Sequence, residues 1–152
     1  MAGYSGTPLP QKLGIKPGHR VALLGAPAGF GDVLGPLPEG VTVTTALARN
    51  KAFDVIVLFA LTARELERRF ASTAKRLVPN GGFWVAWPKR ASGVRTDVTE
   101  NTVRGVALAT GLVDNKVCAV DETWSGLRCV IRLADRPGAA ARRQGRTLSA
   151  RR

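Results

Sequence analysis

RVALLGAP, residues 20–27, is the stretch that decides the fold of this chain. Four apolar residues, Val21–Leu24, run together in it and stop at Gly25, a residue that turns the backbone without steric cost. A buried strand that ends in a glycine turn is typical of the first strand of nucleotide-binding α/β domains, where glycines let the backbone approach a cofactor. Pro27 stands where such loops offer an N–H or a small residue, so the stretch indicates a fold more firmly than an activity.

Downstream of this stretch, apolar runs and helical spacings alternate in the order of an α/β domain with a mostly parallel sheet. Apart from Asp54, the run at 53–60 is apolar, which is typical of a central parallel strand that is buried on both faces. The last two runs indicate an antiparallel hairpin at the sheet edge. We expect strands at 20–26, 41–45, 53–60, 83–87, 116–120 and 127–133, helices at 62–77 and 97–111, and a stub of helix within 29–40.

Capping-box spacing predicts where the two longer helices begin, at Thr62 with Glu65 and at Asp97 with Glu100. Glycine, proline and polar clusters then mark the connections between elements. The expected connections are a turn at 79–82, a hairpin loop at 121–126, and a short helical turn at 11–14.

Length and charge indicate one domain with a basic tail. The 152 residues suffice for a single core, which we assign to residues 1–134 with an extended arm at 1–11. The net charge is +12; residues 135–152 hold six arginines and one aspartate, so they carry +5 and the rest carries +7. The Arg/Ala-rich composition predicts a disordered tail. Such a tail is either a solvated extension or a non-specific binder of nucleic acid.

Composition also argues against several classes of function. The longest apolar run, 55–61, is too short to span a bilayer, and no signal-peptide segment is present, so we expect a cytoplasmic protein without a membrane partner. His19 is the single histidine, and it lies in a turn, which disfavours catalysis by a serine or cysteine with histidine. Cys118 and Cys129 lack metal-site spacing and are expected to be buried free thiols on adjacent strands. We expect no catalytic residue and no metal ligand.

Three segments resemble structural signatures of class I S-adenosylmethionine-dependent methyltransferases. KPGHRVALLG at 16–25 is similar to the approach into their first strand, FDVIV at 53–57 to their fourth strand, and LVPNGGFWV at 77–85 to the turn into their fifth. The terminal hairpin is similar to their last two strands. The resemblance covers about residues 12–133 and implies a single Rossmann-like domain, here truncated and methyltransferase-like.

A second resemblance is to an uncharacterised bacterial family, the domain-of-unknown-function family numbered 3052. It rests on LGIKPG at 13–18, WPK at 87–89 and DETWSGLR at 121–128, and it spans almost all of the domain. This resemblance implies a compact Rossmann-like domain and brings no established activity.

The chain departs from the methyltransferase pattern at the surface that would hold the cofactor. Gly25, Pro27 and Gly29 form a weak candidate cofactor loop. VTTA at 43–46 brings no acid for ribose hydroxyls, and LFAL at 58–61 brings no polar group to orient an acceptor. A strand and its helix are also missing between Ala46 and Phe53. We therefore expect no cofactor, and S-adenosylmethionine belongs to an alternative interpretation.

Basic side chains gather after the strand at 83–87, where ligands bind in open α/β sheets and where the next helix begins. A carboxylate, a phosphate or a nucleic-acid backbone would suit them. The alternative is a solvated basic loop in which Lys89 pairs with an acid such as Asp121. The candidate anion- or partner-binding residues are Lys89, Arg90, Arg95, Trp124 and Arg128.

The tryptophans divide into two groups. Trp84 and Trp87 lie three positions apart in one strand, so they are expected in the core on opposite faces of the sheet. Trp124 is expected in the hairpin loop, either as an exposed contact residue or as a lid folded back on the sheet.

These observations favour a non-catalytic Rossmann-like binding or regulatory module that recognises an anionic small molecule or nucleic acid. The alternative is a degenerate or atypical S-adenosylmethionine-dependent methyltransferase. An exposed hairpin edge permits pairing with a second copy, so a homodimer is also an expectation.

Overall fold

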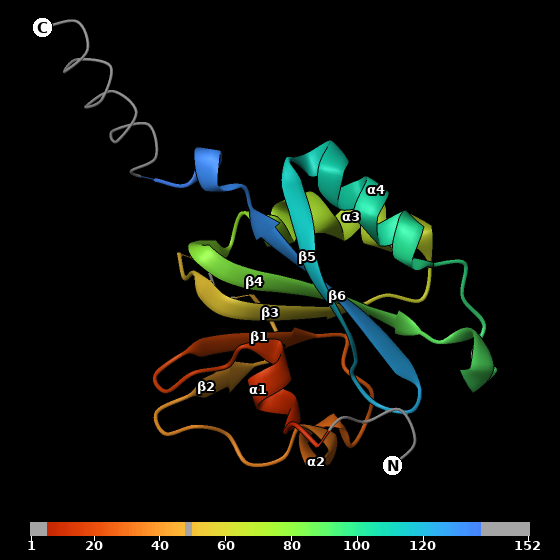
Figure 1. Ribbon diagram of the computed structural model, residues 1–152, viewed down its shortest axis with the longest axis horizontal. Helices are drawn as coiled ribbons and strands as arrows, with labels where there is room; N and C mark the ends of the chain where they lie inside the picture. The colour runs from red at the N-terminus through yellow and green to blue at the C-terminus, as the bar shows by residue number, and fades with distance from the viewer. Residues whose placement is uncertain (1–5, 48–49, 138–152) are drawn as a thin grey trace, which may run out of the picture.

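β1 (Arg20–Leu24) is the apolar strand near one side of the sheet, between β2 and β3. The computed structural model describes residues 6–47 and 50–137, in which six strands form one sheet in the order β2-β1-β3-β4-β6-β5 (Figure 1). β1 is parallel to β2 and β3, β3 is parallel to β4, and β6 is antiparallel to both β4 and β5. This confirms the predicted mostly parallel α/β sheet with a hairpin at its edge. The remaining strands are β2 (Thr42–Thr44), β3 (Phe53–Phe59), β4 (Leu77–Pro88), β5 (Leu112–Ala119) and β6 (Trp124–Ile131).

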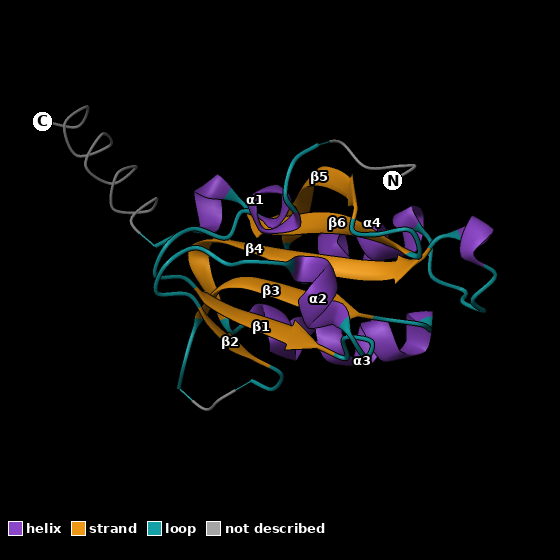
Figure 2. Ribbon diagram, turned by 90° about the horizontal axis from the view of Figure 1, so that it is seen from below, coloured by secondary structure: helices purple, strands orange, loops and turns teal. Residues whose placement is uncertain are grey.

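Helices cover both faces of this sheet (Figures 1 and 2). One core lies beneath α3 and α4, and a second core beneath α1 and α2. Trp87 belongs to the first core and Trp84 to the second, with 7% and 0% of their surfaces exposed, so both predictions are confirmed. The helices are α1 (Leu9–Leu13), α2 (Phe30–Leu34), α3 (Ala63–Ala74) and α4 (Glu100–Thr110).

α1 is held to the sheet by its apolar residues and by one buried hydrogen bond. Leu9 and Leu13 are buried, and the indole Nε1 of Trp84 donates to the carbonyl oxygen of Leu13 at 3.0 Å. The sequence predicted a helical turn that starts at Gln11, after an extended arm. The helix instead begins at Leu9, because a start there places both leucines against the sheet.

The predicted start of α4 at Asp97 is wrong. Thr99 is the N-cap residue, and it forms a capping box with Thr102. Asp97 caps the other helix on this face, since its Oδ1 accepts a hydrogen bond from the backbone N–H of Ala63 at 2.7 Å. Thr62 caps α3 as predicted, because its side chain accepts from the N–H of Glu65. The two helices are therefore joined at their N-termini.

The predicted turn at 79–82 is part of β4 instead. β4 pairs with β3 first at Leu77 opposite Phe53 and then at Gly82 opposite Val55, so several extra residues of β4 are accommodated in an irregularity. Gly81 permits this irregularity, because a Cβ atom there would lie 2.7 Å from the carbonyl oxygen of Asp54. The apolar run at 83–87 therefore predicted only the part of β4 that pairs regularly with β3.

The hairpin turn is shorter than the predicted loop at 121–126. β6 begins at Trp124, whose carbonyl oxygen accepts from the N–H groups of Val120 and Asp121. The carboxylate of Asp121 in turn accepts from the N–H groups of Thr123 and Trp124, at 2.8 and 2.7 Å. These bonds close the turn and place Trp124 in the sheet.

Parts of two predictions lie outside the described residues: positions 1–5 of the arm and positions 138–152 of the basic tail. Between β2 and β3, the residues that the structure describes form no helix or strand. None of the described helices has the length and apolar character needed to cross a membrane.

Candidate functional site

A cavity of about 650 Å³ lies at the carboxyl end of β4, and we call it the carboxyl-end cavity. Lys89, Arg90 and Arg95, three of the basic residues singled out in the sequence, all line it. Its walls also include Trp87 from β4 and Glu100 from the first turn of α4. The structure therefore brings these three basic residues together at the edge of the sheet where α/β proteins bind ligands.

Hydrogen bonds fix the loop that carries the basic residues. The N–H of Lys89 donates to the carbonyl oxygen of Thr123 at 2.7 Å, which joins the loop to the β5–β6 turn. A short 3₁₀ helix, η1 (Arg90–Ser92), follows. The hydroxyl of Ser92 donates to the carbonyl oxygen of Lys89 at 2.7 Å and accepts from the N–H of Val94 at 3.1 Å. These hydrogen bonds hold the backbone that carries the basic side chains in place.

The far side of the loop is joined to the start of α3. The hydroxyl of Thr96 donates to the carbonyl oxygen of Leu61 at 2.6 Å and accepts from the N–H of Val98 at 3.0 Å. Together with the contact from Asp97 to Ala63, this bond sets the distance between the loop and α3. Both helix N-termini at this edge are capped by protein side chains, so the positive charge of the cavity comes mainly from its side chains.

The basic residues of the cavity are not neutralised by carboxylates. In the described part of the chain, no salt bridge involves Lys89, Arg90 or Arg95. Glu100 is instead paired with Arg104, four residues along the same helix, at 2.6 Å. The alternative in which Lys89 pairs with Asp121 does not form, because Asp121 closes the hairpin turn. The cavity therefore presents a net positive field to an anion.

Trp124 does not line this cavity but lies on the opposite face of β6, next to the second core. Its ring meets the ring of Phe59 edge to face at 5.1 Å between centroids, and Phe59 meets Phe30 in the same way at 4.9 Å. Of the two alternatives for Trp124, the structure thus shows the lid. Phe59 ends β3 and Phe30 begins α2, so the three rings form one aromatic cluster over the carboxyl ends of the parallel strands.

The aromatic cluster lies beside the candidate cofactor loop. Gly25 and Gly29 both have positive φ, at +74° and +80°, as their positions in a tight loop require. A Cβ atom at Gly25 would lie 3.3 Å from the carbonyl oxygen of Phe59. The glycine therefore lets the loop backbone lie close to the end of the neighbouring strand β3. The N–H of Phe30 donates to the carbonyl oxygen of Pro27, and Phe30 is 3% exposed. The loop thus turns the chain and buries an aromatic ring.

The residues beside this loop differ from those that an S-adenosylmethionine site uses. The cofactor needs space beside the first loop and an acid for its ribose hydroxyls. Phe30 packs beside the loop with 3% of its surface exposed, and Thr44, at the end of β2, offers a hydroxyl that donates to the carbonyl oxygen of Ala46. This stretch of β2 contains no carboxylate.

Arg128, the fifth candidate residue, lies in a different cavity. That cavity has a volume of about 390 Å³ and lies at the amino ends of β1 and β3, so we call it the amino-end cavity. Lys12, Lys16 and Lys116 line it with Arg128, and sequence reasoning did not group them because they come from distant segments. The register of the hairpin places Lys116 opposite Arg128 and would have grouped these two residues. The sequence alone does not define this register.

The two cysteines are free thiols, as predicted. Cys129 faces the core beneath α4, whereas Cys118, on the neighbouring strand, is half-buried and packs against the other core. Burial raises the pKa of Cys118 and raises the pKa of Cys129 to about 12. Protonated thiols are weak nucleophiles and poor metal ligands. Within residues 6–47 and 50–137, no group of three or more histidine, cysteine or acidic side chains is placed to hold a metal ion.

No protein-family model matches the chain, and no curated protein matches it either. The resemblance to family 3052 therefore stays a prediction.

Among solved structures, the chain is similar to methyltransferases. A SAM-dependent methyltransferase from Aquifex aeolicus shares 16% identity at a TM-score of 0.57, over 80% of this chain and 87% of that one. A ribosomal protein L11 methylase from Lactobacillus delbrueckii subsp. bulgaricus shares 12% at 0.55, over 82% and 75%. Magnesium protoporphyrin IX methyltransferase from Synechocystis PCC 6803, solved with bound SAM, shares 11% at 0.52, over 76% and 71%. The chain thus has the methyltransferase-like Rossmann fold that its sequence resembles.

Proposed function

We propose that this protein is a non-catalytic, methyltransferase-like module that recognises an anionic ligand in the carboxyl-end cavity. One observation carries the proposal: Lys89, Arg90 and Arg95 line a single cavity, and no described carboxylate forms a salt bridge with them. Ligands of open α/β sheets bind at this edge, and uncompensated basic groups favour a carboxylate, a phosphate or a nucleic-acid backbone.

Binding measured at two salt concentrations tests this proposal. We expect the variant Lys89→Ala with Arg95→Ala to bind small phosphorylated metabolites at least about tenfold more weakly than the wild type, because each charge-assisted contact contributes roughly 1.5–3 kcal/mol. The matched control, Arg64→Ala with Arg68→Ala, removes the same charge from the exposed surface of α3. Equal affinities for the two double variants would remove the carboxyl-end cavity from the proposal.

Nucleic acid is the second ligand class to compare, because residues 138–152 are rich in arginine. A chain that ends at residue 137 keeps every described strand and helix. If oligonucleotide binding is lost in this shortened chain and unchanged in the Lys89/Arg95 variant, it belongs to the tail.

A degenerate or atypical S-adenosylmethionine-dependent methyltransferase is the second candidate, and the structural comparisons favour it. The neighbours named above are methyltransferases, and one of them holds SAM. The packing of Phe30 and the lack of an acid after β2 oppose it locally. Calorimetry separates the two candidates: on our proposal, S-adenosylmethionine does not bind at millimolar concentration. Binding at this concentration would favour the transferase instead.

We also propose that β5 supports a homodimer. β5 is the last strand of the sheet, and Val117 in it is 50% exposed. An unprotected edge strand can pair with a second copy. Light scattering after size exclusion tests this, since a monomer at all accessible concentrations would exclude it.

A further inference from the structure

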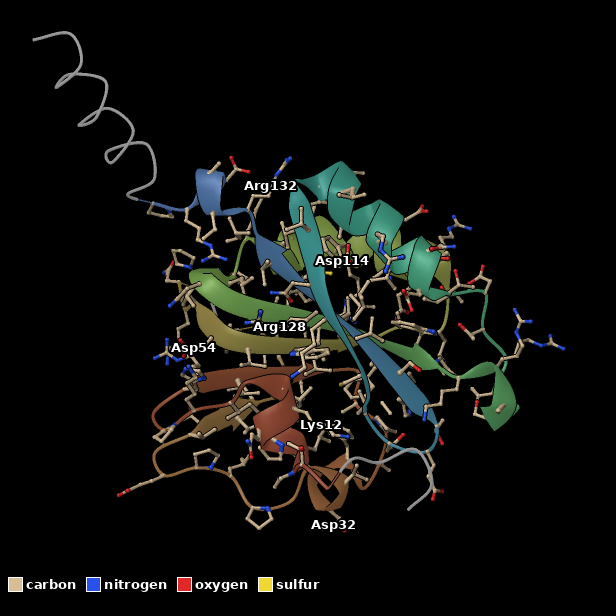
Figure 3. All side chains as sticks on the ribbon, viewed as in Figure 1. Lys12, Asp32, Asp54, Asp114, Arg128 and Arg132 are labelled. Carbon is tan, nitrogen blue, oxygen red and sulfur yellow. The ribbon has the colours of Figure 1, made fainter. Side chains whose placement is uncertain are left out.

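The amino-end cavity is a second basic site, separate from the carboxyl-end cavity. It lies at the other end of the parallel strands, beside α1 and the start of β3. Figure 3 labels Lys12, Asp54 and Arg128, which come from α1, β3 and β6 and all line this cavity. Lys16, His19 and Lys116 complete its basic side chains, and the function proposed for the carboxyl-end cavity uses none of them.

The sheet is built to hold the guanidinium of Arg128 in this cavity. A Cβ atom at Gly82 of β4 would lie 2.4 Å from Nε of Arg128, so the guanidinium lies directly across the glycine backbone. Any other residue at position 82 would displace it. One nitrogen, Nη1, is 3.4 Å from Oδ1 of Asn115, a long and therefore weak hydrogen bond. The side chain is half-buried, yet most of its donor groups have no strong protein acceptor among these contacts.

Positive charges face one another around this guanidinium. Lys116 lies directly opposite Arg128 on the neighbouring strand, an arrangement that is destabilising for like charges. The ammonium of Lys116 is 3.2 Å from the carbonyl oxygen of Lys12, at the last turn of α1. Neither Arg128 nor Lys116 takes part in a salt bridge among the described residues. Burial, together with the nearby Arg136, lowers the pKa of Arg128, as expected for an uncompensated charge.

A single carboxylate is present among the described residues that line the cavity. It belongs to Asp54, and its Oδ2 already accepts a hydrogen bond from the backbone N–H of Arg20 at 2.8 Å. Asp54 therefore has a structural role at the start of β1, and the cavity keeps a strong excess of positive charge.

We propose that the amino-end cavity binds a compact phosphate-bearing small molecule, with Arg128 as the principal contact. A planar guanidinium presents paired donors that match two phosphate oxygens, and Lys116 adds a point charge from the adjacent strand. A bound polyanion also removes the repulsion between these two residues. A volume of about 390 Å³ is within the range of small-ligand sites and suits a ligand of this size. The site is independent of the function proposed for the carboxyl-end cavity.

Calorimetric titration of the full chain with inorganic pyrophosphate tests the site. We expect Arg128→Met to weaken binding about tenfold or more, the usual effect of losing a charge-assisted contact to phosphate. The matched control is Arg132→Met, which removes the same charge just beyond β6, where Arg132 pairs with Asp135 at 3.2 Å. We expect the control to change the affinity less than about twofold, because Arg132 does not line the cavity and salt screens the interaction of exposed charges with a ligand there. Equal effects of the two substitutions overturn the proposal.

A gain-of-affinity variant keeps the test decisive if Arg128→Met does not fold. Asp54→Asn retains an oxygen that can accept from the N–H of Arg20 and removes the negative charge that opposes the ligand. We expect pyrophosphate to bind this variant roughly threefold or more tightly, a change that damage to the fold would not produce. Unchanged or weaker binding contradicts the proposal.

Two further arms separate this site from other sources of anion binding. The Lys89→Ala with Arg95→Ala variant is expected to keep the pyrophosphate site that Arg128→Met weakens, and Arg128→Met is expected to keep the site in the carboxyl-end cavity, so the two proposals fail or succeed separately. A single-stranded oligonucleotide is titrated alongside. If Arg128→Met weakens oligonucleotide binding and leaves pyrophosphate binding unchanged, the assignment to a small phosphate ligand is wrong.

Discussion

Trp84→Phe tests how α1 is attached to the sheet. The indole of Trp84 is fully buried, and its N–H donates at 3.0 Å to the carbonyl of Leu13, the last residue of α1. The last carbonyls of a helix lack partners within the helix, so this bond supplies one. Phenylalanine keeps most of the apolar ring and removes the donor.

The expected cost has two parts. A buried carbonyl left without a partner costs about 1–3 kcal/mol, and the smaller ring leaves space worth about 1 kcal/mol more. Trp87→Phe is the matched control, since Trp87 is also buried, in the same strand, and none of the hydrogen bonds of the described residues uses its indole. We expect Trp84→Phe to destabilise the protein by about 1–3 kcal/mol more than Trp87→Phe does.

Urea unfolding followed by far-ultraviolet circular dichroism measures this difference without relying on tryptophan emission. Each kcal/mol corresponds to roughly 2–4 °C in Tm for a chain of this size, so thermal unfolding gives an independent reading. If both variants lose the same stability at equal m-values, the hydrogen bond to Leu13 contributes nothing, and α1 is held by packing and by its hydrogen bonds to β5.

Three further predictions concern helix capping, backbone strain and pH. Asp97→Ala is expected to cost about 1 kcal/mol in urea unfolding, because the N–H of Ala63 loses its acceptor; no change would refute this role. Gly25→Ala is expected to cost about 1–2 kcal/mol from its positive φ, more if the contact with Phe59 cannot relax, and a neutral result would contradict the loop geometry. Burial raises the pKa of Cys129 from 9.0 to about 12, so the folded state keeps a proton that the unfolded chain loses, and this contribution to stability is present below pH 9.0 and falls as pH rises toward about 12. Cys129→Ala should flatten that decline relative to the wild type.

The sheet was predictable because its signals are local. The apolar run of β3, which only Asp54 interrupts, and the capping residue Thr62 can each be recognised from a few neighbouring positions of the sequence. The start of α4 was not predictable from the sequence, because the side chains of Asp97 and Thr99 can both cap a helix. Only the fold brings the N–H of Ala63 within reach of Asp97. The prediction that Trp124 lies in the hairpin loop was wrong for a related reason. The end of a hairpin turn depends on strand register, which the alternation of apolar and polar residues does not define by itself.

The two cavities also differ in how far the sequence alone could predict them. Lys89, Arg90 and Arg95 follow one strand within a few residues, so the rule for carboxyl ends of strands was enough to group them. The amino-end cavity draws on α1, β3, β5 and β6, and its organising residue is Gly82, whose missing side chain makes room for Arg128. A glycine in a strand shows no such purpose until the neighbouring strand is known.

The aromatic cluster contains an intrinsic fluorophore, Trp124, that can report on the position of α2. Trp84 and Trp87 are shielded from aqueous quenchers, whereas Trp124 is partly accessible, so acrylamide will act mainly on its emission. The indole of Trp124 touches Phe59, which touches Phe30 at the start of α2. Displacement of α2 from the sheet would therefore change the quenching of a fluorophore on β6, and no attached dye would be needed to follow it.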